Sequence, residues 1–416
     1  MRKLHIILGL LLILNLVFPT HIYSKTSPLE PINQDHRISK QYTPNALAVT
    51  TESGQILYQY HYKSQVDPAS LTKMMTMYLT LEQVENGNLS LDDTVKITPK
   101  EEKLSKMPSL ASFKLNAGET YTIDQLLKQT AIVSSNAATM VLGRKIAGSP
   151  SKFTHRMNDK AKALGMTHTH FVNPTGASND LLKPFEPIDY RKELKTSTTA
   201  EDLSLLMHHL LKDHKQVLNY SKLNADVQKG RKMRTTNLSL PGESRGFKGS
   251  DGLKTGTSDN GYNLALTNHK DNLRLNVVVL NVKPYPSDDA EKMRHTIANR
   301  YVKQMREKYE YKKVLSKGRH EINDKVYDVK TDLYDVVPKN MKNYSYKINE
   351  GRIELDYDRS FIKGTKAPSV GVEKVDTLKD KIMDNLLLII VSILFLLTFI
   401  LVITLFIMYR IYKRSK

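Results

Sequence analysis

Ser70-Leu71-Thr72-Lys73 places a hydroxyl and an amine three residues apart at the start of a helical run. Residues at positions i and i+3 share one face of a helix, so this spacing presents a nucleophile and a candidate base to the same small volume. The tetrapeptide alone is a weak signal, since most matches to so short a pattern are ordinary helix surface. The rest of the chain must supply the partners of such a site.

Two further motifs follow in order along the chain, Ser134-Ser135-Asn136 and Lys254-Thr255-Gly256. Each has an ordinary local explanation: a helix cap for Ser134, a turn former for Asn136 and a sheet edge for the Lys-Thr-Gly triplet. If the motifs are unrelated, all three explanations must hold at once, and three ordered motifs are hard to obtain by chance. The sequence therefore favours one site built from all three.

The three motifs contain the groups that acyl transfer requires. This chemistry needs a nucleophile, a base, a proton route to the leaving group, an oxyanion site and a grip on the substrate. Ser70 is the candidate nucleophile and Lys73 the candidate base. Because a lysine has an ordinary pKa of about 10.4, Lys73 can act as a base only where burial and a second cation, for which Lys254 is the candidate, favour its neutral form. We expect Ser134 to relay a proton to the departing amine, and Asn136 to orient the substrate amide or the base.

The third motif supplies the grip on the substrate. Lys254, Thr255 and Thr257 would hold a carboxylate by charge and by hydroxyl donation. The backbone N–H groups of Ser70 and Thr257 would face the developing oxyanion. The sequence therefore predicts that this segment lies directly opposite the nucleophile.

The residues around the first motif predict a β-hairpin followed by a helix. Ala46 to Thr50 and Gln55 to Tyr60 alternate as two short strands around a Glu-Ser-Gly turn. Pro68 then opens a helix that runs to about Glu85. This places Ser70 in a first helical turn, where unpaired N–H groups and the helix dipole favour a nucleophile that takes on negative character.

The middle of the chain predicts helices. Thr122 to Gln125 is typical of a capping box, and the helix that it opens leads to Ser134. Another helix then runs to Ile146, so the second motif lies in a short loop between helices. Thr198 to Glu201 is a second candidate capping box.

From residue 252 the pattern changes to strands, at Leu253 to Thr257, Tyr262 to Thr267 and Leu273 to Val282, followed by a helix from Asp288 to about Tyr309. Strands at the beginning, helices in the middle and antiparallel strands with a helix at the end predict an α/β sandwich. Its sheet would combine distant chain segments.

The C-terminal third predicts a small domain and an anchor. Short alternating stretches indicate a β-rich domain over residues 311–370, joined by a charged linker, 371–385, to an uncharged run from Leu386 to Tyr409. At about 1.5 Å rise per residue, that run crosses a hydrocarbon core of roughly 30 Å. The basic tail 410–416 would stay in the cytoplasm, with the body outside the cell.

The N-terminus and the composition fit an exported protein. Residues 1–24 combine a basic start with a short apolar core, which is typical of a signal peptide; its cleavage site is indistinct, so an uncleaved anchor is left open. The chain of 416 residues has no cysteine, so no disulfide stabilises the predicted catalytic body, residues 25–310. Its formal charge of +19 is spread along the chain, so a solvated surface is the default interpretation; as a partner, an anionic wall polymer or phospholipid surface is favoured over nucleic acid.

Taken together, the motifs resemble those of low-molecular-mass penicillin-binding proteins of the D-alanyl-D-alanine carboxypeptidase family, and more narrowly a staphylococcal type within it. The resemblance covers roughly residues 42–370. It rests on Asp67-Pro68-Ala69-Ser70-Leu71-Thr72-Lys73, Asn173-Pro174-Thr175-Gly176 and Lys254-Thr255-Gly256-Thr257.

The resemblance implies a serine β-lactamase/transpeptidase-like sandwich, with helices on both sides of an antiparallel sheet. It also implies an acyl-Ser70 intermediate, peptidoglycan stem peptides ending in D-Ala-D-Ala as substrate, inhibition by β-lactams, and no metal or organic cofactor. Thr175 would line the cleft, although a Pro-Thr-Gly turn explains it equally well. Water or a second stem peptide would resolve the ester, so carboxypeptidase and transpeptidase activity are both left open.

Two other functions remain as alternatives. A β-lactamase needs a water activated by a base such as Glu, which the sequence does not identify, and the triplet Ser-Ser-Asn, where many β-lactamases have Ser-Asp-Asn, favours a peptidase. A non-catalytic receptor or scaffold would bind the wall through the β-rich domain, but it has little need for the full set of motif residues. His168-Thr169-His170 and His208-His209 lack a recognised metal-ligand spacing, so we interpret them as surface or core histidines.

Overall fold

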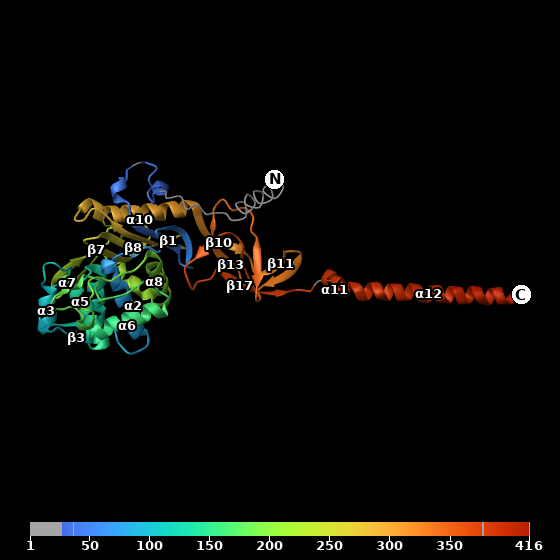
Figure 1. The fold of residues 1–416 in the computed structure, drawn as a ribbon, viewed down its shortest axis with the longest axis horizontal. Coiled ribbons are helices and arrows are strands. Elements are labelled where there is room, and N and C mark those ends of the chain that lie inside the picture. The colour runs from blue at the N-terminus through green and yellow to red at the C-terminus, as the bar shows by residue number, and fades with distance from the viewer. Residues whose placement is uncertain (1–26, 36, 377, 416) are drawn as a thin grey trace, which may run out of the picture.

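The computed structural model describes residues 27–35, 37–376 and 378–415. The predicted signal peptide, residues 1–24, lies outside the described residues. A globular body and a smaller β-rich unit are followed by a long C-terminal helix that extends away from both (Figure 1).

The body is built on one six-stranded antiparallel sheet in the order β16-β2-β1-β9-β8-β7. Its strands are β1 Ala46–Thr51, β2 Gln55–Tyr60, β7 Ser250–Ser258, β8 Gly261–Lys270, β9 Leu273–Val282 and β16 Ser360–Phe361. The predicted hairpin and the three predicted central strands are present, and the sheet combines segments from the two ends of the body.

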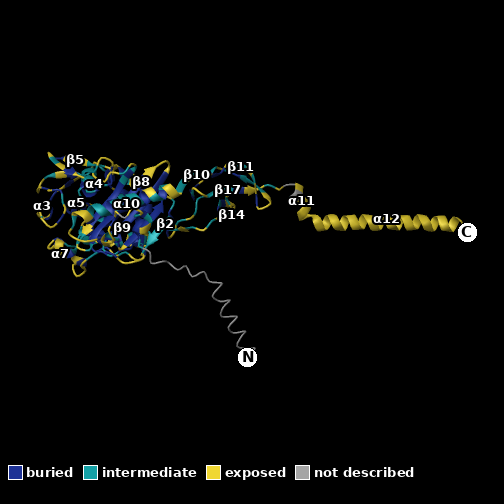
Figure 2. Cartoon of the chain, turned by 90° about the horizontal axis from the view of Figure 1, so that it is seen from above, coloured by how far each residue is buried: buried dark blue, intermediate teal, exposed yellow. Residues whose placement is uncertain are grey.

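Both faces of the sheet are covered, as the α/β sandwich prediction requires. Every residue of β9 is buried, and its side chains alternate between the two cores: Val278 and Leu280 pack with the helices on one face, and Val277 and Val279 with α10, Asp288–Lys308, on the other. Figure 1 shows α10 along one face and the helices α2, α5, α6 and α8 on the opposite face. This arrangement places the core on both sides of the sheet, where burial is deepest (Figure 2).

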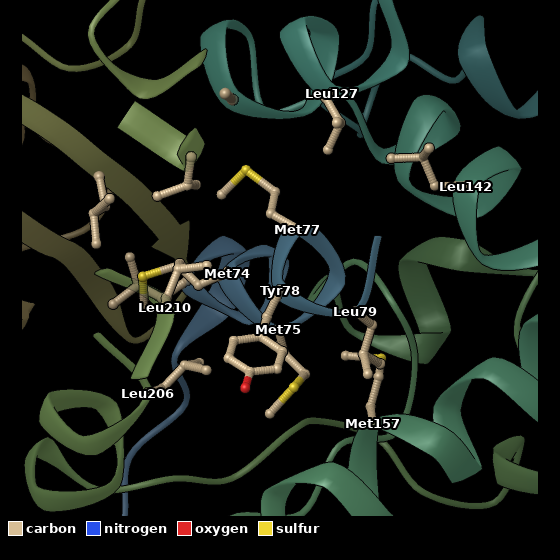
Figure 3. Packing of buried hydrophobic residues seen from close by; sticks show 14 of the residues in the cluster. Met74, Met75, Met77, Tyr78, Leu79, Leu127, Leu142, Met157, Leu206 and Leu210 are labelled. Atoms are coloured by element: carbon tan, nitrogen blue, oxygen red, sulfur yellow. The ribbon is translucent and has the colours of Figure 1, made fainter. Parts of the chain in front are cut away.

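The helical layer is organised around α2, Lys73–Glu85, whose first nine residues are all buried. Met74, Met75, Met77, Tyr78 and Leu79 point outward from α2 into contact with its neighbours on several sides (Figure 3). A helix that is apolar all round must be enclosed by protein. The surrounding elements are α3 Pro99–Ser105, α4 Ile123–Ile132, α5 Asn136–Ala147, α6 Pro150–Ala163, α7 Asn179–Leu182, α8 Ala200–Asp213 and α9 Leu218–Ser221, with the strand pairs β3 Thr94–Lys96 with β4 Thr120–Thr122 and β5 Ala225–Gln228 with β6 Arg231–Arg234.

Helix ends follow local chemistry. Thr122 and Gln125 form the predicted capping box of α4. The second predicted box is wrong: the cap of α8 is Thr199, whose side chain accepts from the N–H of Asp202, so the helix begins one residue later than the pattern indicated. Short 3-10 turns complete the body: η1 Glu30–Ile32, η2 Lys40–Tyr42, η3 Ala69–Thr72, η4 Ile188–Tyr190 and η5 Lys215–Val217.

The β-rich unit has its own small core around residues such as Val329, Leu333 and Ile353. It contains β10 Tyr309–Leu315 paired with β13 Leu333–Pro338, and a second sheet of β11 Gly318–Ile322, β12 Lys325–Val329, β17 Ser369–Lys374, β15 Arg352–Leu355 and β14 Tyr346–Asn349. A segment between β15 and β17 returns to the body. There β16 pairs with β2, and Ile362 joins the main core.

Two helices end the chain. α11, Leu378–Asp384, leads to α12, Leu386–Arg414, which includes the whole of the predicted span. In the part of the chain that the structure describes, α12 alone is long and apolar enough to cross a membrane, and none of its most apolar window is buried. Its exposed surface is clear in Figure 2.

Candidate active site

The motif residues lie around one cleft of about 460 Å³ between β7 and the helical layer. Ser70, Ser134, Asn136, Thr255 and Thr257 are among the side chains and backbone segments that line it. Lys73 and Lys254 are almost fully buried behind this lining, at 0% and 1% exposure. The cleft therefore brings the three motifs together, as the sequence predicted.

Ser70 lies in the 3-10 turn η3, directly before α2. The predicted helix from Pro68 is therefore α-helical only from Lys73, because Ala69 has a φ of +47° and cannot continue a right-handed helix. The side chain of Asp67 accepts a hydrogen bond from the N–H of Ala69 at 2.8 Å and fixes this conformation. The turn thus holds Ser70 just before the N-terminus of α2, outside the α-helix itself.

Lys73 Nζ is surrounded by three oxygen atoms. It lies 2.8 Å from Ser70 Oγ, 2.9 Å from Asn136 Oδ1 and 2.7 Å from the carbonyl of Thr175. Burial, and next the positive charge of Lys254, lower the pKa of Lys73 well below its ordinary value. The neutral form of the amine is therefore favoured, and the amine is positioned to take a proton from the Ser70 hydroxyl.

Ser134 lies between α4 and α5, whereas Asn136 begins α5, so only part of the second motif occupies the predicted loop. Ser134 has a φ of +58°, and its buried Oγ has no hydrogen-bond partner among the described residues. Asn136 is the first residue of α5, and its amide nitrogen donates to the carbonyl of Ala111 at 2.8 Å. That bond fixes the amide so that its oxygen faces Lys73, whereas the Ser134 hydroxyl remains available to a ligand.

Lys254 lies on β7 with Arg294 of α10 behind it. Burial, and next the charge of Arg294, lower the pKa of Lys254 to about 7. Arg294 is itself 1% exposed and donates to the carbonyl of Gly256 at 2.9 Å and to Thr257 Oγ1 at 3.1 Å. Arg294 also forms an ion pair with Glu291 at 2.8 Å, so Lys254 is the cation on this side that is left to pair with a carboxylate when it is protonated.

The hydroxyls of the third motif differ in their partners. Thr255 Oγ1 is 2.6 Å from Thr236 Oγ1, and Thr257 is exposed to the cleft. Strand β7 packs tightly on η3, since a Cβ on Gly256 would lie 2.7 Å from the carbonyl oxygen of Pro68. The backbone of Thr257 is therefore held close to that of Ser70, as the predicted oxyanion site requires.

Thr175 occupies a buried turn beside the cleft. Its side chain is 0% exposed and donates to Asn173 Oδ1 at 2.8 Å, while its carbonyl receives Lys73. Its neighbours Gly176 and Ala177 line the cleft, and Thr175 does not. The turn packs against the residue before Ser70, because a Cβ on Gly176 would lie 1.9 Å from the carbonyl oxygen of Ala69.

The charged residues that line the cleft were not predicted as site residues from the sequence; they are Asp67, Asp180, Lys195, Asp259, Glu291 and Arg294. Arg294 lies on a helix more than 200 residues from Ser70, and no local pattern marks it. Asp67 lines the cleft, and burial raises the pKa of its carboxyl. Lys195 lies 3.8 Å from Asp67 and also pairs with Asp259 across the cleft. Only Asp67, which belongs to the quoted motif around Ser70, had a signal that could have found it.

One group of side chains in the described ranges has the composition of a metal site: His168, Glu201 and Asp202 at the start of α8. Asp202 Oδ2 already accepts hydrogen bonds from the N–H of His168 and from Thr169 Oγ1. None of the three lines the cleft.

Comparison with known protein families gives two matches. Residues 34–284 match the model described as D-alanyl-D-alanine carboxypeptidase, and residues 311–373 match a domain of unknown function. The first match contains every motif of the cleft, and the second coincides with most of the β-rich unit.

Individual relatives agree with the first match. The chain is 30% identical over 241 residues to D-alanyl-D-alanine carboxypeptidase DacF of Bacillus subtilis, which covers 56% of this chain and 56% of that protein. It is 30% identical over 243 residues to D-alanyl-D-alanine carboxypeptidase DacC of Escherichia coli, with 56% and 54% covered. The chain thus spans about half the length of these relatives. The narrower resemblance to a staphylococcal type stays a prediction.

Solved structures share the fold. A peptidoglycan synthesis regulatory factor from Streptococcus pneumoniae superimposes with a TM-score of 0.70 at 24% identity, covering 80% of this chain and 99% of that one. Penicillin-binding protein D2 from Listeria monocytogenes, in its ampicillin-bound form, gives a TM-score of 0.52 at 27% identity over 63% of this chain and 96% of that one. The transpeptidase-like fold that the motifs implied is thereby confirmed.

Proposed function

The chain belongs to the D-alanyl-D-alanine carboxypeptidase family of serine peptidases, and from this premise we propose that it is a membrane-anchored D-Ala-D-Ala carboxypeptidase that acts on peptidoglycan stem peptides through an acyl-Ser70 intermediate. One observation carries the proposal: a buried lysine amine with a lowered pKa lies 2.8 Å from a serine hydroxyl that opens onto a cleft.

In the acylation step, Ser70 Oγ attacks the carbonyl carbon of the terminal peptide bond while its proton passes to the neutral amine of Lys73. The C–N bond then breaks, and Ser134 relays a proton to the leaving amine. The products are an ester on Ser70 and free D-alanine. Water attacks the ester, releases the shortened peptide as a carboxylate and restores the serine; a second stem peptide with an amine could take the place of water.

Recognition of the substrate depends on the opposite wall. Lys254, Thr255 and Thr257 hold the terminal carboxylate, with Arg294 behind them adding positive potential. A bound carboxylate stabilises the charged form of Lys254, whose pKa in the free protein is about 7. The N–H groups of Ser70 and Thr257 receive the oxyanion. Thr175 contributes through its carbonyl, which helps to fix the amine of Lys73.

The chemical test uses Ser70→Ala, with Ser345→Ala, a substitution at an exposed position of the β-rich unit, as control. We expect Ser70→Ala to abolish labelling by a fluorescent penicillin and release of D-alanine from a model stem peptide, whereas the control keeps both. Retention of both by Ser70→Ala refutes the proposal. Mass spectrometry of the products with and without a D-amino acid acceptor separates hydrolysis from transfer, and rapid turnover of the penicillin would instead identify a β-lactamase.

We also propose that α12 anchors the protein in the cell membrane of a Gram-positive-like cell, with the cleft outside and the basic tail inside. The absence of cysteine from the natural chain allows a direct test. A membrane-impermeant maleimide should label Ser345→Cys in intact cells, and Ser415→Cys only after the membrane has been opened. The reverse pattern would overturn the orientation.

The positive charge of the body suits the anionic polymers of such a wall, with peptidoglycan peptides and β-lactams as ligands of the cleft. Association with those polymers should weaken as the salt concentration rises, because exposed charges are screened. Binding that does not respond to salt would exclude this electrostatic role.

A further inference from the structure

A second cavity lies where the β-rich unit meets the body, at the end of the sheet away from Ser70. It has a volume of about 460 Å³, within the range of small-molecule sites. Its wall combines the turn at Glu52, the β8–β9 turn with His269 and Arg274, and the paired strands β10 and β13. Nothing in the proposed acyl transfer uses these residues.

Two tyrosines form one wall of this cavity. Tyr311 and Tyr334 have ring centroids 5.7 Å apart and planes inclined by 20°, so the rings stack and remain 40% and 43% exposed. They lie on the same face of neighbouring strands, since Tyr311 pairs with Val336, two residues from Tyr334. Stacked rings held rigidly and exposed to solvent offer a flat apolar surface to a ligand.

Arg274 supplies a donor that no protein group uses. Its two terminal nitrogens donate to Asp251 and Thr267 at 2.9 Å, but its buried Nε has no hydrogen-bond partner among the described residues. The side chain is 4% exposed and lines the cavity. Because an unpaired buried N–H is costly, this donor is a group that a ligand in the cavity would satisfy.

Glu52 places an acceptor opposite that donor. Its carboxylate lies 4.0 Å from Arg274 Nε, too far for a hydrogen bond, and it is half exposed. Glu52 and the stacked rings line the same cavity, and burial, and next the negative charge of Glu52, raise the pKa of Tyr311. An exposed pair with Lys215 at 3.6 Å adds little to its fixation.

The chemistry of these groups selects a class of ligand. Glu52 would repel an anion and Arg274 would repel a cation. A hydroxyl, in contrast, can accept a hydrogen bond from the Nε–H of Arg274 and donate one to the carboxylate of Glu52 at the same time. A ring with hydroxyls on its edge and an apolar face fits both this pair and the tyrosines. We propose that the cavity binds neutral sugar rings, namely the N-acetylhexosamine glycan that carries the stem peptides.

The position of the cavity decides what such binding would do. Thr257 pairs with Tyr262 at one end of β8, and His269 lies seven residues further along, which is roughly 24 Å at about 3.4 Å per residue. A glycan held there need not carry the peptide in the cleft. The site therefore retains the enzyme on the polymer, and it leaves hydrolysis of a small peptide unchanged. The choice of this glycan rests on the proposed function.

The test measures binding of the β-1,4-linked tetramer of N-acetylglucosamine to the full chain by calorimetry, in a detergent without a sugar head group. The wild type should bind saturably at millimolar concentrations or below. The double variant Tyr311→Ala/Tyr334→Ala should bind at least about tenfold more weakly, a factor that equals roughly 1.4 kcal/mol. Val227→Ala, which removes another exposed apolar side chain from the distant β5–β6 hairpin, should bind like the wild type.

Labelling of Ser70 by fluorescent penicillin is followed in every variant. If the double variant does not label or shows no unfolding transition, Glu52→Ala decides, because it changes a half-exposed side chain and should also weaken binding. The inference is overturned if the wild type does not bind the tetramer. It is also overturned if the tyrosine and Glu52 variants bind the tetramer as tightly as the wild type does, or if stem peptide displaces the bound tetramer and free sugar does not. Loss of penicillin labelling by the wild type, with sugar binding retained, would refute the proposed function and leave the glycan site standing.

Discussion

Lys73 Nζ lies 2.8 Å from Ser70 Oγ, in a position that is completely buried. Replacement by methionine leaves an unbranched side chain that is one atom shorter and removes the amine. We expect Lys73→Met to lower the rate of acylation by a β-lactam by about 10² to 10⁴, the usual contribution of a positioned base. Stopped-flow labelling measures this rate, with Lys103→Met, at an exposed position of α3, as control. An unchanged rate in a folded Lys73→Met protein would exclude the base.

The two buried lysines predict a bell-shaped dependence of acylation on pH. The neutral form of Lys73 is present above its lowered pKa, so the rate should rise with pH on the acid side. The charged form of Lys254 is present below a pKa of about 7, so kcat/KM should fall as pH rises beyond that value. The acid and alkaline limbs of this pH profile report the titration of the coupled pair Lys73 and Lys254 rather than of either residue alone.

A β-lactam methyl ester provides the control for this profile. It lacks the carboxylate that Lys254 would hold, so its acylation rate should lose the alkaline limb and keep the acid limb. The same alkaline limb with acid and ester would show that Lys254 does not recognise the carboxylate by charge.

Gly176 predicts a steric effect on the nucleophile. Its φ is +76°, and a Cβ there would lie 1.9 Å from the carbonyl oxygen of Ala69 and 2.5 Å from Thr72 Oγ1. Gly176→Ala should therefore displace the turn that carries Ser70 and slow acylation at least tenfold, about 1.4 kcal/mol of activation free energy. Gly87→Ala is a matched control, because Gly87 has a φ of +72° with nothing within 4 Å of the added atom. Equal acylation rates in the two variants would contradict the steric argument.

The buried pair Arg359–Asp335 predicts a large effect on stability. The two side chains are 5% and 0% exposed, and their nearest atoms are 2.7 Å apart. Arg359→Ala leaves the aspartate buried without its partner, which should lower the free energy of unfolding by about 3 to 5 kcal/mol. Lys313→Ala, which breaks an exposed pair with Asp332, should cost about 1 kcal/mol or less. Denaturant unfolding distinguishes the two, and similar costs would show that the buried pair is not structural.

The sequence predicted those parts of the structure that short-range patterns determine. The strand Leu273–Val282 has the predicted bounds, because it is rich in Val and Leu and the turn residues Lys270-Asp271-Asn272 come before it. The capping box of α4 was predicted because Thr122 and Gln125 are only three residues apart. The start of α8 was ambiguous because Thr198 and Thr199 are adjacent and either could cap the helix. The three motifs were found because each is compact, and the fold brings them together around one cleft.

The features that the sequence did not predict are long-range. Arg294 supports Gly256 and Thr257 from another element, and no spacing rule links them. The pairing of β16 with β2 joins two residues of β16 to a strand some 300 positions earlier, which no local pattern marks. The division of the chain at residue 310 stays a prediction, and this pairing shows that residues beyond it complete the sheet of the body.

The pairing also constrains the order of events during biosynthesis. Strand β2 is made early, but one of its edges stays open until residues 360 and 361 have been synthesised, which takes roughly 15 to 60 s at about 5 to 20 residues per second. An open edge is a template for another chain. The nascent polypeptide is therefore most vulnerable to aggregation in that interval, and a truncation before Ser360 would make that vulnerability permanent.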